Sequence, residues 1–267
     1  MVNSHRSMVN GRKAMIFAAG IGSRLRPITD SIPKALVPVG GVPMLQRTLL
    51  QLKSFGFDNV TINIHHFGQQ IIDFLLSNNN FGMEIHISDE REELLDTGGG
   101  ILKAKAFLEG NEPFLVHNVD ILSNINLQEV YRQHVESKAD ATLLVSDRNT
   151  TRKLLFDKGM RLHGWLNHAT GETKPEGFMP DAIQHRELAF EGIHIISPTL
   201  FNKMGEGTQW QGKFSIIPFY LSVCQSLNLQ GYELKDITWF DIGKPETLQQ
   251  ANRDLLPFSN KDQKNYW

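Results

Sequence analysis

The chain has 267 residues, of which 40% are hydrophobic and 21% are charged, and its formal net charge is -2. These values are typical of a globular protein, and a chain of this length can bury the core of one α/β domain. They argue against a disordered chain and against nucleic acid as the main partner, since nucleic-acid-binding proteins usually carry a basic excess. No run approaches the roughly 18 apolar residues of a membrane-spanning helix, so no membrane partner is expected.

The two ends of the chain and its single cysteine add further expectations. Residues 1–12 have no apolar stretch of the kind found in signal peptides, so we predict a disordered leader or an expression remnant there. A single domain is predicted over residues 13–256, followed by a C-terminal tail at 257–267. Cys224 is the only cysteine, which excludes an internal disulfide and favours a reducing, cytoplasmic location.

Strands and helices are predicted to alternate along the first half of the chain. Residues 14–20 form a short apolar run that ends in glycine, which is typical of a strand buried on both faces of a parallel sheet. Leucines at helical spacing predict a helix at 44–57. The alternation then continues with strands at 59–66, 83–89, 113–120 and 140–146 and helices at 69–79, 99–109 and 127–137.

The pattern changes in the second half of the chain. Residues 153–189 are expected to form hairpins and a long loop over one edge of the sheet. The predicted order is completed by strands at 190–197 and 238–243 and helices at 214–227 and 245–256. This order predicts an α/β fold of three layers, Rossmann-like, in which helices cover both faces of a mostly parallel mixed sheet.

A glycine-rich segment follows the first predicted strand and contains several basic residues. Because glycine lacks a Cβ, such a turn lets backbone N–H groups approach a phosphate. The dinucleotide-binding fingerprint and the P-loop both require spacings that this segment lacks. The segment instead resembles the signature of the sugar-1-phosphate nucleotidylyltransferases, G-x-G-S/T-R-L/M-x-P-x-T followed by P-K, at Gly20, Gly22, Ser23, Arg24, Leu25, Pro27, Thr29, Pro33 and Lys34.

The resemblance implies an enzyme that joins a nucleoside triphosphate and a sugar 1-phosphate into a nucleotide sugar and releases pyrophosphate. In this family Arg24 would bind the departing β- and γ-phosphates, and Lys34 would bind the phosphates at the reacting centre. Such a direct displacement needs positioning and charge neutralisation, which a planar guanidinium and a compact ammonium group supply. The loop residues expected to bind the nucleotide are Ala18, Ala19, Gly20, Gly22 and Ser23.

Two aspartates at the ends of predicted strands are the candidate ligands of Mg²⁺, the expected cofactor. Asp120 and Asp241 both lie where an apolar strand runs out, and the carboxyl ends of parallel strands gather in one crevice. Mg²⁺ takes one or two protein carboxylates beside water and phosphate oxygens. These segments resemble the family patterns N-G-D and W-x-D-x-G-x-P, with Val119 in place of the usual glycine.

Other segments are expected to bind the base and the sugar. Gly98 and Gly99 lie where related enzymes place a turn against the base, although a plain helix start also explains them. Asn63 is expected to line the nucleotide crevice. Many relatives use the lysine of an E-K-P motif for the sugar phosphate, and its absence in register leaves Lys174 and Lys213 as candidates. The predicted sugar-phosphate residues are Asn118, Glu191, Gly192 and Lys213.

Two further polar segments are not assigned a catalytic or metal-binding role. His65 and His66 are adjacent in a predicted strand, where neighbouring side chains point to opposite faces, which disfavours joint metal ligation. They are expected to line the nucleotide crevice or to pack at its rim. The acidic run at residues 89–93 is expected to be a solvated loop.

Two alternatives to this activity stay open. One is a cytidylyltransferase acting on phosphocholine or another non-sugar phosphate, and the other is a non-catalytic nucleotide-binding module. The second would be expected to have lost the arginine, the lysine or the aspartates, and all are present. The chain is most similar to short family members without a left-handed β-helix domain, such as the N-acetylmuramate 1-phosphate uridylyltransferases and the mannose- and heptose-1-phosphate enzymes. The base, the sugar and the oligomeric state stay open.

Overall fold

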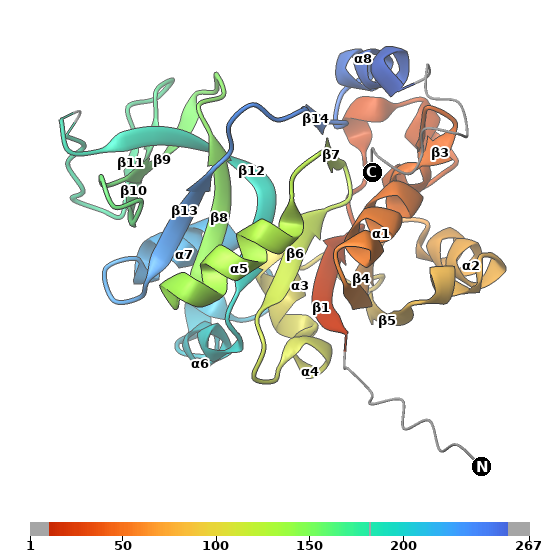
Figure 1. Cartoon of the computed structure of the whole chain (residues 1–267), viewed down its shortest axis with the longest axis horizontal. Helices are drawn as coiled ribbons and strands as arrows, with labels where there is room; N and C mark the ends of the chain where they lie inside the picture. The colour runs from red at the N-terminus through yellow and green to blue at the C-terminus, as the bar shows by residue number, and fades with distance from the viewer. Residues whose placement is uncertain (1–10, 182, 256–267) are drawn as a thin grey trace.

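The structure, a computed structural model, describes residues 11–181 and 183–255 (Figure 1). Its centre is a mixed sheet with the strand order β11-β10-β9-β12-β6-β1-β4-β5, and β8 and β13 join it beside β12. Four neighbouring strands are parallel: β1 (Arg12–Phe17), β4 (Phe57–Ile64), β5 (Glu84–Asp89) and β6 (Phe114–Asn118). β12 (Arg186–Ile196) runs antiparallel to β6. The predicted α/β class is confirmed.

Side chains of the central strands alternate between two hydrophobic cores, one on each face of the sheet. On β1, Ala14 and Ile16 belong to one core and Met15 to the other, as expected for a strand covered on both faces. The first face is covered by α1 (Met44–Ser54), α2 (Gly68–Ser77), α5 (Leu127–Ser137) and α8 (Pro245–Leu255). The second is covered by α3 (Asp96–Lys103), α4 (Lys105–Leu108), α6 (Phe201–Met204) and α7 (Ile216–Val223). The predicted three layers are therefore present.

Antiparallel hairpins form one edge of the sheet, as predicted for residues 153–189. They consist of β9 (Arg152–Phe156), β10 (Leu162–Asn167) and β11 (Thr173–Lys174), with β9 paired to β12. In Figure 1 these strands lie at the far side of the molecule from α2. Leu154 and Phe156 of β9 pack in the same core as α7, which fixes the hairpins against that helix.

The element boundaries differ from the predictions in several places. The predicted helix at 99–109 is divided into α3 and α4, and the predicted helix at 214–227 is shorter because α7 ends at Val223. Four strands were not predicted: β7 (Ile121–Ser123), which pairs with β14 (Trp239–Asp241), β13 (Leu229–Glu233), which pairs with β8 (Ala141–Ser146), and the paired β2 (Pro38–Val39) and β3 (Val42–Pro43). β2, β3 and β7 have only two or three residues each, too few for a periodic hydrophobic signal. The small hairpin of β2 and β3 precedes α1.

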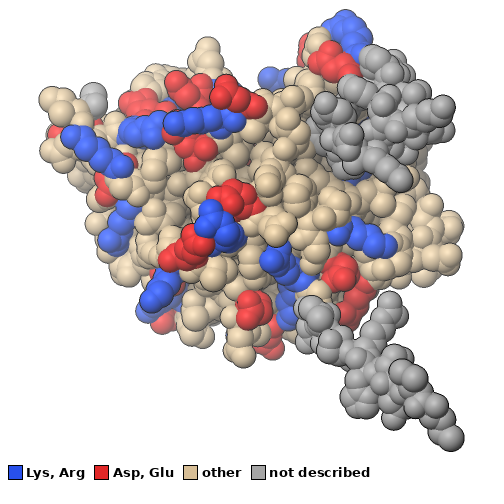
Figure 2. All heavy atoms as spheres, in the orientation of Figure 1, with Lys and Arg blue, Asp and Glu red and all other residues tan. Residues whose placement is uncertain are grey.

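β1 begins at Arg12, the last residue of the predicted leader, and residues 1–10 and 256–267 lie outside the described residues. The division of the chain into leader, domain and tail stays a prediction. Among the described helices, none combines the length and the apolar character needed to cross a bilayer. Figure 2 shows basic and acidic side chains lying next to one another over the face in view.

Candidate active site

The candidate active site lies where the parallel strands β6, β1 and β4 end. Phe17, the last residue of β1, pairs with Asn63 of β4 on one side and with Asn118 of β6 on the other. The chain adds β4 on one side of β1 and β6 on the other, so the order of the strands reverses at this point of the sheet. Open α/β sheets bind ligands at such a topological switch point. A cavity of about 410 Å³, the reaction cavity, occupies this position, and its polar lining includes Lys34, Asn63, Thr97, Asn118, Asp120 and Lys213.

The glycine loop reaches the reaction cavity at Gly20 and is shaped by Gly22. Gly22 has a left-handed φ of 71°, and its carbonyl accepts hydrogen bonds from Leu25 N at 2.8 Å and from Thr29 Oγ1 at 2.9 Å. A Cβ at Gly22 would lie 3.1 Å from Cβ of Lys34. Glycine is therefore required both for the backbone conformation and for the close approach of Lys34. Arg24 and Ser23 lie in the exposed turn that follows.

Asn63 ties the start of the loop to β4. Its Oδ1 accepts from the backbone N–H groups of Ala18 at 2.8 Å and Ala19 at 3.3 Å, and its Nδ2 donates to Glu90 Oε1 at 2.8 Å. Both ends of the amide are thus engaged within the protein, so Asn63 lines the cavity as a residue that fixes the loop. Its predicted contact with the nucleotide stays a prediction.

The expectation of a solvated acidic loop at residues 89–93 is wrong for Glu90, which is fully buried. Its carboxylate accepts from Asn63 and, at 3.0 Å, from the backbone N–H of Leu95. These two donors compensate for the loss of water that burial imposes on a charged group. His65, placed in a strand by prediction, instead follows β4 and shares a 2.7 Å hydrogen bond between its Nδ1 and the carbonyl of Glu90.

Lys34 forms an ion pair with Asp120 on the wall of the reaction cavity. The two side chains are only 12% and 16% exposed, so water screens their attraction poorly. His117 lies nearby on β6 and is fully buried. Burial lowers the pKa of His117 to about 4, although its hydrogen bond with the Asn118 carbonyl and the charge of Asp120 act in the opposite direction. The imidazole is therefore neutral near pH 7, and Lys34 supplies the positive charge beside Asp120.

The short ladder between β7 and β14 brings the two predicted metal ligands together. Asp241 pairs with Ile121, the residue after Asp120, and Ile242 N donates to the Asp120 carbonyl at 2.8 Å. Two carboxylates from strand ends fit Mg²⁺, which completes its shell with water and phosphate oxygens. Among the described residues, no group of three or more His, Cys, Asp or Glu side chains is arranged to hold a metal. The protein would thus contribute two ligands.

Arg24 lies against the turn that follows Asp241. Gly243 N donates to Asp241 Oδ1 at 2.8 Å. A Cβ at Gly243 would lie 2.5 Å from Arg24 Nη2 and 2.6 Å from Asp241 Oδ1. Sequence reasoning did not assign Gly243 a role, although it belongs to the W-x-D-x-G-x-P pattern. Its lack of a side chain lets the arginine and the aspartate approach the same point.

Gly98 and Gly99 lie in the first turn of α3 and pack against the segment that precedes α7. Their N–H groups both donate to the carbonyl of Phe214, at 2.8 and 3.1 Å. A Cβ at Gly98 would lie 2.2 Å from the Phe214 ring, and one at Gly99 would lie 2.1 Å from the Gly212 carbonyl oxygen. Packing therefore explains both glycines, and their contact with a base stays a prediction.

Gly98→Ala is expected to lower the free energy of unfolding by about 1–3 kcal/mol, because the new methyl group overlaps the Phe214 ring. Urea denaturation measures this change. Gly205→Ala is the matched control, since its Cβ would meet nothing closer than a carbonyl oxygen at 3.8 Å. Equal stability of the two variants would show that Phe214 moves away freely and that packing does not require Gly98.

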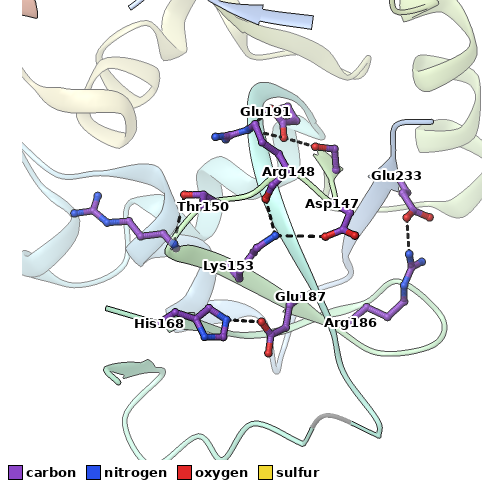
Figure 3. Close-up of polar contacts among 11 residues, drawn as sticks. Asp147, Arg148, Thr150, Lys153, His168, Arg186, Glu187, Glu191 and Glu233 are labelled. Carbon is purple, nitrogen blue, oxygen red and sulfur yellow. Dashed lines mark hydrogen bonds and ion pairs between the residues drawn. The ribbon is translucent and has the colours of Figure 1, made fainter. Parts of the chain in front are cut away.

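The predicted sugar residues lie at two places. Asn118 and Lys213 line the reaction cavity, and a Cβ at Gly192 would lie 2.9 Å from Asn118 Nδ2. Glu191 is 1% exposed, and its carboxylate accepts from Ser146 Oγ at 2.6 Å and from Arg148 Nε at 3.2 Å (Figure 3). The glutamate is therefore satisfied by protein donors. Arg148 could not be identified from the sequence, because only the fold brings it to Glu191.

Lys174, the other candidate for the sugar-phosphate lysine, does not line the reaction cavity. It lies on β11, in the wall of a second cavity described below. The structure thus places Lys213, and not Lys174, with Lys34 and Asp120. Contact of either lysine with a sugar phosphate stays a prediction.

A Rossmann-like sheet with a glycine loop and two strand-end aspartates at its switch point defines the class of nucleotidyltransferases. The chain belongs to the Nucleotidyl transferase family, which it matches over residues 13–257. It is 42% identical over 248 residues to the N-acetylmuramate α-1-phosphate uridylyltransferase of Neisseria meningitidis, covering 90% of this chain and 96% of the relative. The corresponding enzyme of Caulobacter vibrioides is 29% identical over 258 residues, covering 91% and 96%.

Solved structures agree on the fold. A Bacillus anthracis protein described as a glucose-1-phosphate thymidylyltransferase superposes with a TM-score of 0.76 at 21% identity, covering 93% of this chain and 97% of that one. The family match and the relative at 42% identity confirm the resemblance that the glycine loop predicted, and they confirm the prediction of an enzyme.

Proposed function

We propose that the chain transfers a uridylyl group from UTP to N-acetylmuramate α-1-phosphate, giving the UDP-sugar and pyrophosphate. The general class, a sugar-1-phosphate nucleotidylyltransferase, follows from the family and its named relatives. These relatives support it over a cytidylyltransferase for non-sugar phosphates. The choice of base and sugar rests on the relative at 42% identity, which aligns over nearly its whole length.

One structural observation carries the assignment of catalysis: Lys34 and Asp120 pair in the reaction cavity, with Asp241 held beside them through β7 and β14. A nucleotide-binding protein that had lost catalytic activity would have no need to keep Lys34, Asp120 and Asp241 close together. Asp120 and Asp241 would hold Mg²⁺, whose chemistry is to neutralise and orient the triphosphate oxygens.

The remaining residues act on charge and position. Lys34 lies between the glycine loop and Asp120, where its ammonium group can hold an oxygen of the attacked α-phosphate. Arg24 lies at the turn beyond Asp241, where its guanidinium can hold the departing pyrophosphate. An oxygen of the sugar phosphate forms the new bond to the α-phosphorus as the bond to pyrophosphate breaks. Because a phosphate monoester is mostly a dianion near pH 7, with a second pKa of about 6, no general base is required.

The reaction is expected to proceed by direct displacement with both substrates bound, since no hydroxyl or thiol that lines the described site is paired with a base, and Lys34 is engaged in the ion pair with Asp120. Initial-rate plots should give intersecting lines, and a chiral α-thio-UTP should react with inversion at phosphorus. Retention, or a uridylylated protein trapped when the sugar phosphate is omitted, would contradict this mechanism.

The substrate assignment is tested by pyrophosphate release with four nucleoside triphosphates and a panel of sugar 1-phosphates. UTP with N-acetylmuramate 1-phosphate is expected to give the highest kcat/KM, and a chelator is expected to abolish turnover until Mg²⁺ is restored. A preference of more than about tenfold, or about 1.4 kcal/mol, for another pair would overturn the assignment but not the class.

A further inference from the structure

A second cavity, of about 520 Å³, lies between the hairpins at the sheet edge and α7. Its strand residues are direct neighbours across the ladder: Arg152 pairs with Asn167, and Trp165 pairs with Lys174. Paired residues project from the same face of a sheet, so these four side chains share one surface. Ser215, just before α7, belongs to the opposite wall. The cavity is therefore built from regular elements.

The charge in this cavity is predominantly positive. Its lining includes three basic residues, Arg148, Arg152 and Lys174, and one acidic residue, Glu172. Two of the cations are already neutralised, because Arg148 binds buried Glu191 (Figure 3) and Lys174 lies 3.2 Å from Glu172. Arg152 is exposed and has no carboxylate partner within the described ranges 11–181 and 183–255. Its guanidinium is thus the charge that remains available to a ligand.

The second cavity adjoins the reaction cavity at two points. The hydroxyl of Thr97, which lines the reaction cavity, lies 3.4 Å from the hydroxyl of Ser215, which lines the second. Along β12, Phe190 lines the second cavity, and Gly192, two residues further, packs against Asn118 of the reaction cavity. The walls of the two cavities therefore meet near Ser215 and along β12, on the side of the reaction cavity that Thr97 and Asn118 line.

We propose that the second cavity binds an acidic substituent on the sugar ring and that Arg152 recognises its carboxylate. The inference rests on the proposed function, since N-acetylmuramate carries a lactyl ether whose carboxylate distinguishes it from N-acetylglucosamine. The planar fork of an arginine matches a carboxylate in two parallel hydrogen bonds. The indole of Trp165 offers an apolar surface to the carbon atoms of the substituent. Arg152 is therefore a specificity-determining residue.

The test compares N-acetylmuramate 1-phosphate with N-acetylglucosamine 1-phosphate, which lacks only the lactyl group. Arg152→Gln is expected to raise KM for the muramate about 10- to 100-fold, the range of a hydrogen bond between charged groups, with kcat within about twofold. The ratio of kcat/KM between the two sugars falls by the same factor. Arg152→Lys keeps the charge without the fork and should recover part of this ratio. The control Arg132→Gln, at an exposed arginine of α5, should leave both values unchanged.

An unchanged ratio in Arg152→Gln would overturn the inference while the proposed function stands. If the wild-type enzyme used neither sugar with UTP, the proposed function would fail, and calorimetry with the two sugar 1-phosphates alone would decide the inference. Tighter binding of the muramate to the wild type but not to Arg152→Gln supports the carboxylate site. Equal binding of both sugars by the wild type overturns it.

Discussion

Asp241→Asn is expected to lower kcat at least about 10³-fold, or about 4 kcal/mol at the barrier, while the fold is kept. The substitution preserves the volume of the side chain and removes the charge that would hold Mg²⁺. The amide oxygen of asparagine can still accept the hydrogen bond from Gly243 N, so the turn after β14 should remain. Asp120→Asn should cause a similar loss. Pyrophosphate release at saturating UTP and Mg²⁺ measures both.

The control for these variants is Asp73→Asn, because Asp73 is an acid on α2 whose contact, with Gln69, is on the exposed surface. Its kcat should equal that of the wild type. If Asp241→Asn or Asp120→Asn stayed within about threefold of wild type, under about 1 kcal/mol, that residue would be excluded as a ligand. The double variant should lose little more than the worse single one, since two ligands of one ion act as a unit.

The parts of the site that lie in one continuous segment could be predicted from the sequence. The glycines, Arg24 and Lys34 have fixed spacing within the loop, and each spacing follows from a local requirement such as the left-handed φ of Gly22. Asp120 and Asp241 could be predicted as separate strand ends. The contact between them could not, because it depends on the pairing of β14 with β7, and β7 has only three residues and carries no periodic signal.

Residues whose role depends on distant partners could not be assigned from the sequence. Glu90 stands in an acidic run that composition predicts to be solvated, and only the donors from Asn63 and Leu95 explain its burial. Arg148 and Arg152 likewise lie in a polar stretch without a motif. Their surroundings differ, because Arg148 pairs with Glu191 of β12, whereas Arg152 lines the second cavity and pairs with no carboxylate among the described residues. In each case the deciding partner is supplied by another strand or loop.

Lys34→Met is expected to lower kcat/KM for UTP at least about 10³-fold, about 4 kcal/mol, because it removes the cation beside the attacked phosphate. Methionine is chosen because it keeps an unbranched stem where Cβ and Cγ of Lys34 pack closely against Gly22. Lys34→Arg should recover little, since its planar group is larger than the ammonium that now fits against Asp120.

The same substitution also separates catalysis from stability. In the free enzyme, Lys34→Met leaves Asp120 without its cation, but Asp120 still borders the reaction cavity, so water can solvate it. The loss of unfolding free energy should therefore stay near 1 kcal/mol, well below the 3–5 kcal/mol of a broken, fully buried pair. Lys203→Met is the control, because it breaks the exposed pair with Glu206, and neither residue lines the reaction cavity or the second cavity. A collapse of stability with normal kinetics in the folded fraction would assign Lys34 a packing role, since a residue that binds the reacting phosphate must change turnover more than folding.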